Sequence, residues 1–272
     1  MSMITWPVPA PSLPEGVYSP LADAARAAAA AYGAARRRYP RQELAEEVAT
    51  GADGTPTMRV DALVEAAIVD VIDAAQVNLL SEEAGFVDHG SAVTLVIDPM
   101  DGSANAAMGV PLSCFAGAVF RDGVATEALT VWLDTGRAWW ALAGQPTPYQ
   151  TTGRTTVDGS SIAMLRPKDN SREAWLRVAS RVDRVRVLST TCLETALVAE
   201  GSMDAFVDPG SDTHRIMDLA AAMVTLPSAG GVVVDVRGRP LEFDLDLSHR
   251  WSGIAAATRQ LADELAETVV LT

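Results

Sequence analysis

Two aspartates stand three positions apart in the segment Asp98-Pro-Met-Asp101-Gly-Ser103, directly after the apolar run of residues 93–97. Carboxylates on a tight loop at the end of a strand can converge on one cation, because hard metal ions prefer oxygen ligands. Asp-Pro and Asp-Gly are also ordinary turn sequences. Taken alone, the segment therefore favours a plain turn over a metal site.

Two further acidic segments change this balance. Glu82-Glu83 precedes the first segment and Asp218 follows it, so all the candidate ligands are carboxylates. An all-oxygen set suits magnesium rather than zinc, and the three histidines have no mutual ligand spacing. Gly102 and Ser103 would offer backbone N–H groups to a phosphate oxygen. Helix capping is the structural alternative for Asp218, which opens a predicted helix.

The elements predicted around these acids place them at the ends of strands and helices. Residues 77–80 and 93–97 are short β-favouring runs, and each ends at or just before acids. Apolar positions recur at helical spacing over residues 63–72, so Asp61 lies at or near a helix start. Residues 51–57 are a loop by composition.

The N-terminal part of the chain carries no candidate chemistry. Residues 1–16 are rich in proline and lack periodicity, which predicts an extended arm. Ser19-Pro20 then supplies an N-cap and a first-turn proline for an alanine-rich helix that ends in three arginines.

The rest of the chain indicates a layered α/β protein. Residues 114–142 contain β-rich runs punctuated by Asp122-Gly123 and Asp134-Thr-Gly136, as expected of antiparallel hairpins. Alternating strands and helices follow, and we expect two closely packed domains, residues 1–150 and 151–272, that share a cleft. The predicted strands of the second half cover residues 162–165, 185–188, 205–207 and 231–236, and the predicted helices cover residues 172–182, 192–200 and 218–226.

The composition excludes several classes of partner. The 272 residues are 49% hydrophobic, which is enough for a large buried core. A formal charge of −14 argues against nucleic acid or an anionic membrane as the main partner, since both need a positive surface. Cys114 and Cys192 lie in apolar contexts and are expected to be reduced core residues. Without a signal peptide or a membrane-spanning run, the protein is expected in the cytoplasm.

Together these segments resemble the inositol monophosphatase superfamily. The match comprises Ser81-Glu82-Glu83, then Asp98-Pro-Met-Asp101-Gly-Ser103-Ala-Asn105, and later Asp218-Leu-Ala-Ala221 with Ala229-Gly-Gly231. Residues 51–57 and 77–83 and Arg215-Ile-Met-Asp218 are most similar to the archaeal-type branch, which handles inositol monophosphate and fructose 1,6-bisphosphate. The resemblance implies a five-layer α-β-α-β-α sandwich of mixed α/β class, dependence on Mg²⁺ and a homodimer.

The resemblance also implies which residues hold two or three Mg²⁺ ions. One ion would be bound by Glu82, Asp98 and the carbonyl of Met100. A second ion would be bound by Asp98, Asp101 and Asp218. Asp61 matches the position near a third, weaker ion.

Catalytic and substrate-binding roles follow from the same resemblance. The Ser103 hydroxyl and Glu82 would orient the attacking water, with Asp61 beside them, and Gly102 and Ser103 would hold the phosphate. Three further residues match positions on the substrate side of the site: Thr190, Thr191 and Asp208.

The implied reaction is in-line attack of water on the phosphorus of a sugar or cyclitol phosphate, without a phosphoenzyme and with inhibition by lithium. The substrate side departs from the family pattern, because Ser189 stands where glycine is common and Pro209-Gly210 replaces valine and arginine. The missing arginine removes a bidentate clamp for a second phosphate. Two alternatives stay open: a 3′(2′),5′-bisphosphate nucleotidase of the same superfamily, and a catalytically silent metal-binding homologue.

Overall fold

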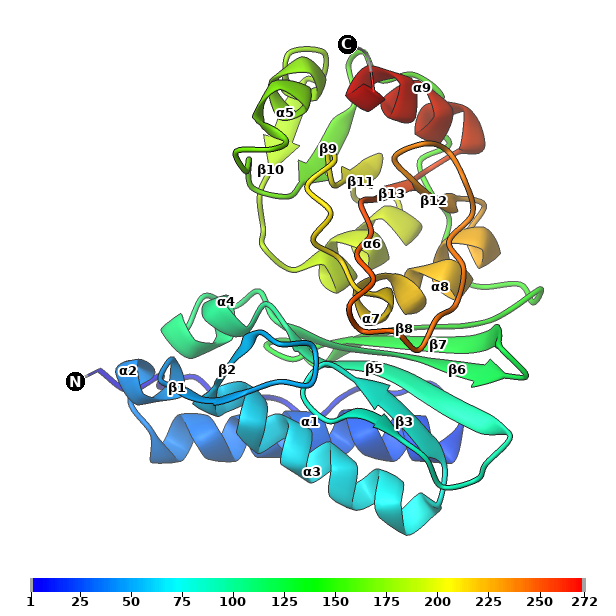
Figure 1. Ribbon diagram of the computed structural model, residues 1–272. Helices are drawn as coiled ribbons and strands as arrows, with labels where there is room; N and C mark the ends of the chain where they lie inside the picture. The colour runs from blue at the N-terminus through cyan, green and yellow to red at the C-terminus, as the bar shows by residue number, and fades with distance from the viewer. Residues whose placement is uncertain (1, 271–272) are drawn as a thin grey trace.

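Five layers of helices and sheets alternate along the molecule (Figure 1). This computed structural model describes residues 2–270, so Met1, where the predicted arm begins, and residues 271–272, at the end of the second predicted domain, lie outside it. The predicted α-β-α-β-α sandwich is confirmed. The outer layers are α1 (Ser19–Arg38) with α3 (Arg59–Ala75), and α5 (Arg172–Ala179) with α9 (Arg259–Val270); the middle layer is α6 (Thr191–Ala199), α7 (Ile216–Ala220) and α8 (Ala222–Ser228).

The first sheet has six strands, all of which precede residue 143. They are β3 (Asn78–Ser81), β4 (Gly85–Val87), β5 (Val93–Asp101), β6 (Cys114–Arg121), β7 (Val124–Trp132) and β8 (Arg137–Leu142). Their spatial order is β4-β3-β5-β6-β7-β8, and only β3 and β5 are parallel. The two predicted hairpins are present, with Gly123 and Gly136 at positive φ in their turns.

Helices α1 and α3 cover the outer face of this sheet. Apolar residues recur every four positions along α3, at Val60, Val64, Ile68 and Ile72, and all four are fully buried. They form one stripe on the helix, which packs on the inward side chains of β5 and on the alanine-rich face of α1. This packing fixes the start of α3, and with it Asp61, close to the end of β5.

The second sheet has five strands, all of which follow residue 160. They are β9 (Ser161–Met164), β10 (Arg184–Arg186), β11 (Ala205–Val207), β12 (Val232–Asp235) and β13 (Gly253–Ala256). The order is β10-β9-β11-β13-β12, with β9 parallel to both of its neighbours and β13 antiparallel to both of its own. One apolar core joins this sheet to α5 and α9, and another joins it to α6 and α8.

A small hairpin lies beside the first sheet. It consists of β1 (Glu47–Thr50) and β2 (Pro56–Met58), and in Figure 1 it lies next to the short helix α2 (Arg41–Leu44) and below the short helix α4 (Ser103–Met108). The loop of residues 51–55 joins the two strands and folds back on the end of β3. The N–H of Ala52 donates to the carbonyl of Glu83 at 3.1 Å, and the N–H of Asp53 donates to that of Glu82 at 3.3 Å.

The proline-rich arm has no helix or strand over residues 2–17, as predicted. It is held against the molecule rather than projecting from it. The buried Arg36 side chain donates to the Trp6 carbonyl at 2.6 Å and pairs with buried Asp134 at 3.1 Å. Since both charged groups are desolvated, each depends on the other for its neutralisation.

Three element predictions need correction. Tyr18, not Ser19, is the N-cap of α1, because the helix already begins at Ser19 and no side chain caps it. The predicted helix of residues 218–226 is two helices, α7 and α8, which meet at Ala221. Pro56 and Thr57, predicted as loop, belong to β2. Along residues 2–270, no helix has the length and apolar character that a bilayer crossing requires.

Candidate metal and phosphate site

The candidate site lies where β5 ends against the middle helices. Side chains alternate between the two faces of a strand, so Leu95 and Ile97 join the core under α1 and α3, whereas Val96 packs against α7. Asp98 follows Val96 by two positions and therefore faces the middle layer. Its side chain is almost fully buried.

A glycine turn ends β5 and begins α4. Gly102 has a φ of +86°, and a Cβ at this position would lie 2.6 Å from the Leu112 carbonyl oxygen. Only glycine fits here, because a side chain would be strained and would also collide. Asn105, on α4, donates from its Nδ2 to the carbonyls of Leu112 at 2.9 Å and Leu188 at 2.8 Å. These bonds link the turn to the segment before α6.

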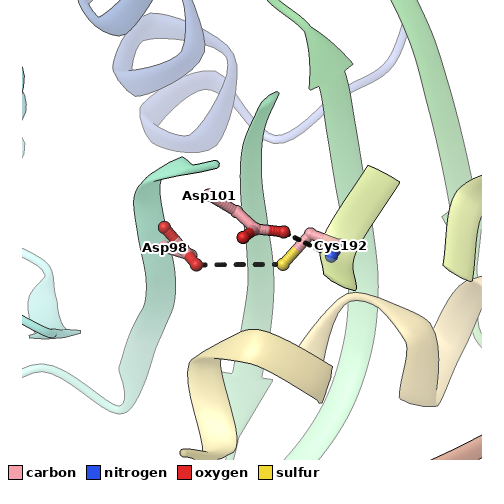
Figure 2. A group of neighbouring side chains, drawn as sticks. All are labelled: Asp98, Asp101 and Cys192. Atoms are coloured by element: carbon pink, nitrogen blue, oxygen red, sulfur yellow. Dashed lines mark hydrogen bonds between the residues drawn. The ribbon is translucent and has the colours of Figure 1, made fainter. Parts of the chain in front are cut away.

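Asp98, Asp101 and Cys192 converge between the end of β5 and the start of α6 (Figure 2). Each offers one ligand atom, and these atoms lie within 4.8 Å of one another. Asp98 Oδ2 is 3.9 Å from Cys192 Sγ. Asp101 Oδ2 accepts hydrogen bonds from the Cys192 N–H at 2.5 Å and the Thr190 hydroxyl at 3.1 Å. The α6 start thus orients Asp101 towards Asp98.

Arg215 joins Glu82 to Asp218. Its guanidinium bonds Glu82 Oε1 directly, lies 3.4 Å from Asp218 Oδ2 and contacts Asp53 Oδ2 at 2.7 Å. The Arg215 N–H also donates to Asp218 Oδ2 at 2.6 Å, which makes Asp218 part of the cap that begins α7. Capping, the structural alternative for Asp218, is therefore present together with its place among the acids.

A cavity of about 90 Å³ opens beside these acids. Asp61 Oδ1 is buried in its wall without a hydrogen-bond partner, and the Ser103 hydroxyl donates to the Met100 carbonyl at 3.0 Å. An orphaned carboxylate oxygen at a polar cavity is satisfied by a cation or by water. The lining residues are Pro56, Met58, Asp61, Glu82, Glu83, Asp98, Pro99, Met100 and Ser103.

Burial and mutual repulsion raise the pKa values of several of these acids. Burial raises the pKa of Asp61 to about 7, and burial with repulsion from Asp218 raises the pKa of Asp101 to about 7. Burial also raises the pKa of Glu82 to about 8, against the opposing effect of Arg215. The pKa of Asp98 lies well above its usual value because of burial and repulsion by Asp101, Asp218 and Glu82.

On the substrate side, the three predicted residues make internal contacts. The Thr190 hydroxyl is bonded to Asp101, and the Thr191 hydroxyl lies 3.0 Å from His214 Nε2. Asp208 is fully buried and accepts hydrogen bonds from the N–H and the hydroxyl of Ser211. Their substrate contacts stay a prediction.

Ser189 keeps the backbone of the glycine that the family pattern has at its position. Its φ is +59°, in the left-handed region that L-residues rarely adopt. The departure in sequence therefore leaves the local chain path as glycine would set it, at the cost of strain in the turn before α6.

Three residues of the site have no role predicted from the sequence. Asp53 is predicted to lie in a loop, although its carboxylate is fully buried against Arg215. Arg215 belongs to a matched motif without a role of its own, and Cys192 is predicted only as a core cysteine. Both cysteines are indeed buried and free. For Arg215, its position three residues before Asp218 was the available signal, since residues i and i+3 meet at a helix start.

Comparison with known proteins finds relatives that match most of the chain. The model of the inositol monophosphatase family matches residues 17–271. A fructose-1,6-bisphosphatase/inositol-1-monophosphatase of Methanothermobacter thermautotrophicus is 30% identical over 249 residues, which cover 84% of this chain and 88% of the relative. The inositol-1-monophosphatase ImpA of Mycolicibacterium smegmatis is 32% identical over 201 residues, with 68% and 71% covered.

Solved structures give the same picture of the fold. The crystal structure of an inositol monophosphatase-fructose 1,6 bisphosphatase has a TM-score of 0.75 and 26% identity, covering 84% of this chain and 92% of that one. The extragenic suppressor protein suhB from Bartonella henselae has a TM-score of 0.78 at 21% identity, with 93% and 97% covered. The second likeness concerns the fold alone.

The glycine turn predicts a difference between two alanine substitutions. Gly102→Ala should lower the free energy of unfolding by about 3 kcal/mol or more, since strain and collision add. Gly123→Ala is the matched control: its φ is +78° but nothing lies within 4 Å of the added Cβ, so about 1 kcal/mol is expected. Urea unfolding of both variants measures this, and equal losses would contradict the close contact at Gly102.

The raised pKa values predict an unusual pH dependence of stability. Without metal ions, the folded protein holds protons on Glu82 and Asp101 that the unfolded chain releases at lower pH. The folded state therefore binds more protons than the unfolded state between about pH 5 and pH 8, and stability falls as the pH rises through this window. Thermal unfolding in chelator should show a falling Tm, with a shallower slope for Asp98→Asn. A Tm that rises with pH would contradict the buried, protonated cluster.

Proposed function

The chain belongs to the inositol monophosphatase family, and from this premise we propose that it hydrolyses sugar or cyclitol phosphomonoesters with the help of bound Mg²⁺. The single observation that carries the proposal is the convergence of Asp98, Asp101, Glu82 and Asp218 beside a cavity with an orphaned carboxylate oxygen. Phosphoric monoester hydrolysis is the activity shared by the relatives' names.

The donor set fits magnesium. The proposed ligands come from three segments and are carboxylates together with the carbonyl of Met100, which are hard oxygen donors; the Cys192 thiol beside them is a soft donor and is not among the proposed ligands. A divalent cation bound between these carboxylates would neutralise their mutual repulsion. We propose that Glu82, Asp98 and the Met100 carbonyl hold one ion and that Asp98, Asp101 and Asp218 hold a second. Asp61 would lie near a third.

The chain's own residues would hold and orient the reactants. A bound divalent cation supplies Lewis-acid chemistry, lowering the pKa of water and neutralising phosphate charge. Gly102 and Ser103 would offer their N–H groups to the phosphate oxygens. Glu82 and the Ser103 hydroxyl would orient the attacking water, and the contact from Ser103 to the Met100 carbonyl supports this placement. No side-chain nucleophile is needed, which accords with a buried Cys192 rather than an exposed thiolate.

The substrate we propose carries one phosphate on a hydroxylated ring. Gly210 provides no side chain where the archaeal-type pattern has arginine, and Lys168 already donates to the Thr213 hydroxyl. A second phosphate on the substrate would therefore lack the arginine that could bind it through two hydrogen bonds. Thr191 and Asp208 would meet ring hydroxyls only if their present internal bonds rearrange. A homodimer is proposed on the resemblance alone.

Asp98→Asn should reduce Mg²⁺-dependent phosphate release by at least about 100-fold, because this carboxylate is shared by both proposed ions. Release is measured over a panel of inositol phosphates, fructose 1,6-bisphosphate, other sugar phosphates and adenosine 3′,5′-bisphosphate. Asp70→Asn, an exposed acid on α3, is the control and should keep full activity. Full activity of Asp98→Asn would sink the proposal, and sole activity on the adenosine compound would favour the nucleotidase alternative.

Lithium should inhibit the same reaction. A monovalent cation of similar size that displaces one Mg²⁺ leaves the site with one positive charge too few, so turnover falls. The assay is phosphate release at fixed Mg²⁺ with rising LiCl, and an equal series of KCl corrects for ionic strength. Unchanged rates at high millimolar Li⁺ would count against this expectation.

A further inference from the structure

Arg215 occupies a central position among the acids of the site. Its guanidinium contacts carboxylates from three separate segments: Asp53 in the loop of residues 51–55, Glu82 after β3 and Asp218 in α7. Two of these three partners are proposed metal ligands. The side chain of Arg215 is itself largely buried, so these pairs are poorly screened by solvent.

Arg215 supplies positive charge that the cluster otherwise lacks. Along residues 2–270, it is the only cationic side chain that pairs with Glu82, Asp98, Asp101 or Asp218. Arg250 approaches only Asp53, at 3.7 Å. Lys168 is engaged by Thr213 instead. The repulsion among the acids is thus relieved at one point.

The guanidinium and a metal ion would need the same oxygen atoms. Arg215 Nη2 uses Glu82 Oε1, and Nη1 faces Asp218 Oδ2. A divalent cation on these carboxylates would draw off their negative charge and repel the nearby guanidinium, so each positive group weakens the hold of the other. The arginine and the metal would therefore compete for Glu82 and Asp218.

The geometry also provides a place for the arginine after release. Asp53 Oδ2 binds Nε at 2.7 Å, on a different edge of the guanidinium from the two atoms that face the metal ligands. Asp53 is fixed independently, since its Oδ1 accepts hydrogen bonds from the Thr55 N–H and hydroxyl at 2.8 Å each. The arginine can therefore give up Glu82 and Asp218 while it keeps Asp53.

We propose that Arg215 is the internal counter-ion of the metal centre, a positioning residue that holds Glu82 and Asp218 together in the metal-free protein and yields both to the incoming cation. This role rests on the proposed function. On this proposal, a metal ion that binds the site takes the place of the Arg215 guanidinium at Glu82 and Asp218. The role also couples the loop of residues 51–55 to the site, since the Thr55 hydroxyl oxygen lies 3.2 Å from Glu82 Oε1.

If the role of Arg215 were merely structural, its removal would change the Mg²⁺ affinity in the opposite direction. If Arg215 only shaped the site, its removal would loosen Asp218 and Glu82 and so weaken Mg²⁺ binding. If it competes with the metal, its removal should tighten Mg²⁺ binding even though the metal-free protein becomes less stable. Affinity and stability then move in opposite directions.

The experiment uses isothermal titration of Mg²⁺ into the chelator-treated full chain and into Arg215→Met, with thermal unfolding of both in chelator. We expect about tenfold tighter Mg²⁺ binding in the variant, because a charge-assisted competitor is gone, together with a metal-free Tm lower by several degrees. Arg250→Met is the matched control. It touches neither metal ligand, and its affinity should stay within about twofold of the unaltered chain.

The possible failures are distinguishable. Mg²⁺ binding that Arg215→Met leaves unchanged or weakens would overturn the counter-ion role alone. An equal tightening in Arg250→Met would also overturn it, because the effect would then be one of general charge. No measurable Mg²⁺ binding to the unaltered chain would overturn the proposed function instead.

Discussion

Repulsion among buried carboxylates is the constraint on which the site depends. Asp98 and Asp101 at the end of β5, Glu82 after β3 and Asp218 in α7 share one buried space between the two sheets. Two like charges roughly 4 Å apart cost about 4 kcal/mol even at an effective dielectric constant of about 20. The folded chain therefore holds these groups together only with protons, with Arg215 or with cations. Cations that the acids attract would also neutralise the charge of a bound dianionic phosphate.

The fold tolerates this repulsion because apolar packing fixes separately each helix or strand that carries one of the acids. The stripe on α3 places Asp61, the alternation along β5 places Asp98, and the packing of α7 on β5 places Asp218. Gly102 then turns the chain so that Asp101 faces the start of α6. Apolar packing thus brings the segments together, and hydrogen bonds and ion pairs of the acids themselves, such as those of Asp101 with the start of α6, complete the arrangement.

Local patterns predicted the strands and helices that carry the acids, whereas the five layers and the grouping of the acids were implied by the resemblance to the family. The strand runs before Glu82 and Asp98, the helical stripe after Asp61 and the glycine turn at Gly102 are each readable over a few residues. Arg215 and Asp53 were missed as partners because 162 positions separate them and only the docking of the hairpin loop brings them together. The alanines around Ala221 favour one continuous helix, so the sequence does not indicate that α7 ends at Ala220 and α8 begins at Ala222. The domain boundary, the substrate contacts and the cellular location stay predictions.

The side chain of Asn105 limits which residues can replace it in related sequences. The Asn105 amide satisfies two carbonyls, those of Leu112 and Leu188, with the two hydrogens of a single nitrogen. Aspartate has nearly the same shape, yet it would set an acceptor against two acceptors. A leucine would fill the space but leave both carbonyls without a hydrogen-bond donor. The join between the Gly102 turn and the segment before α6 therefore depends on the amide at position 105, which no side chain of similar shape without two N–H donors can replace.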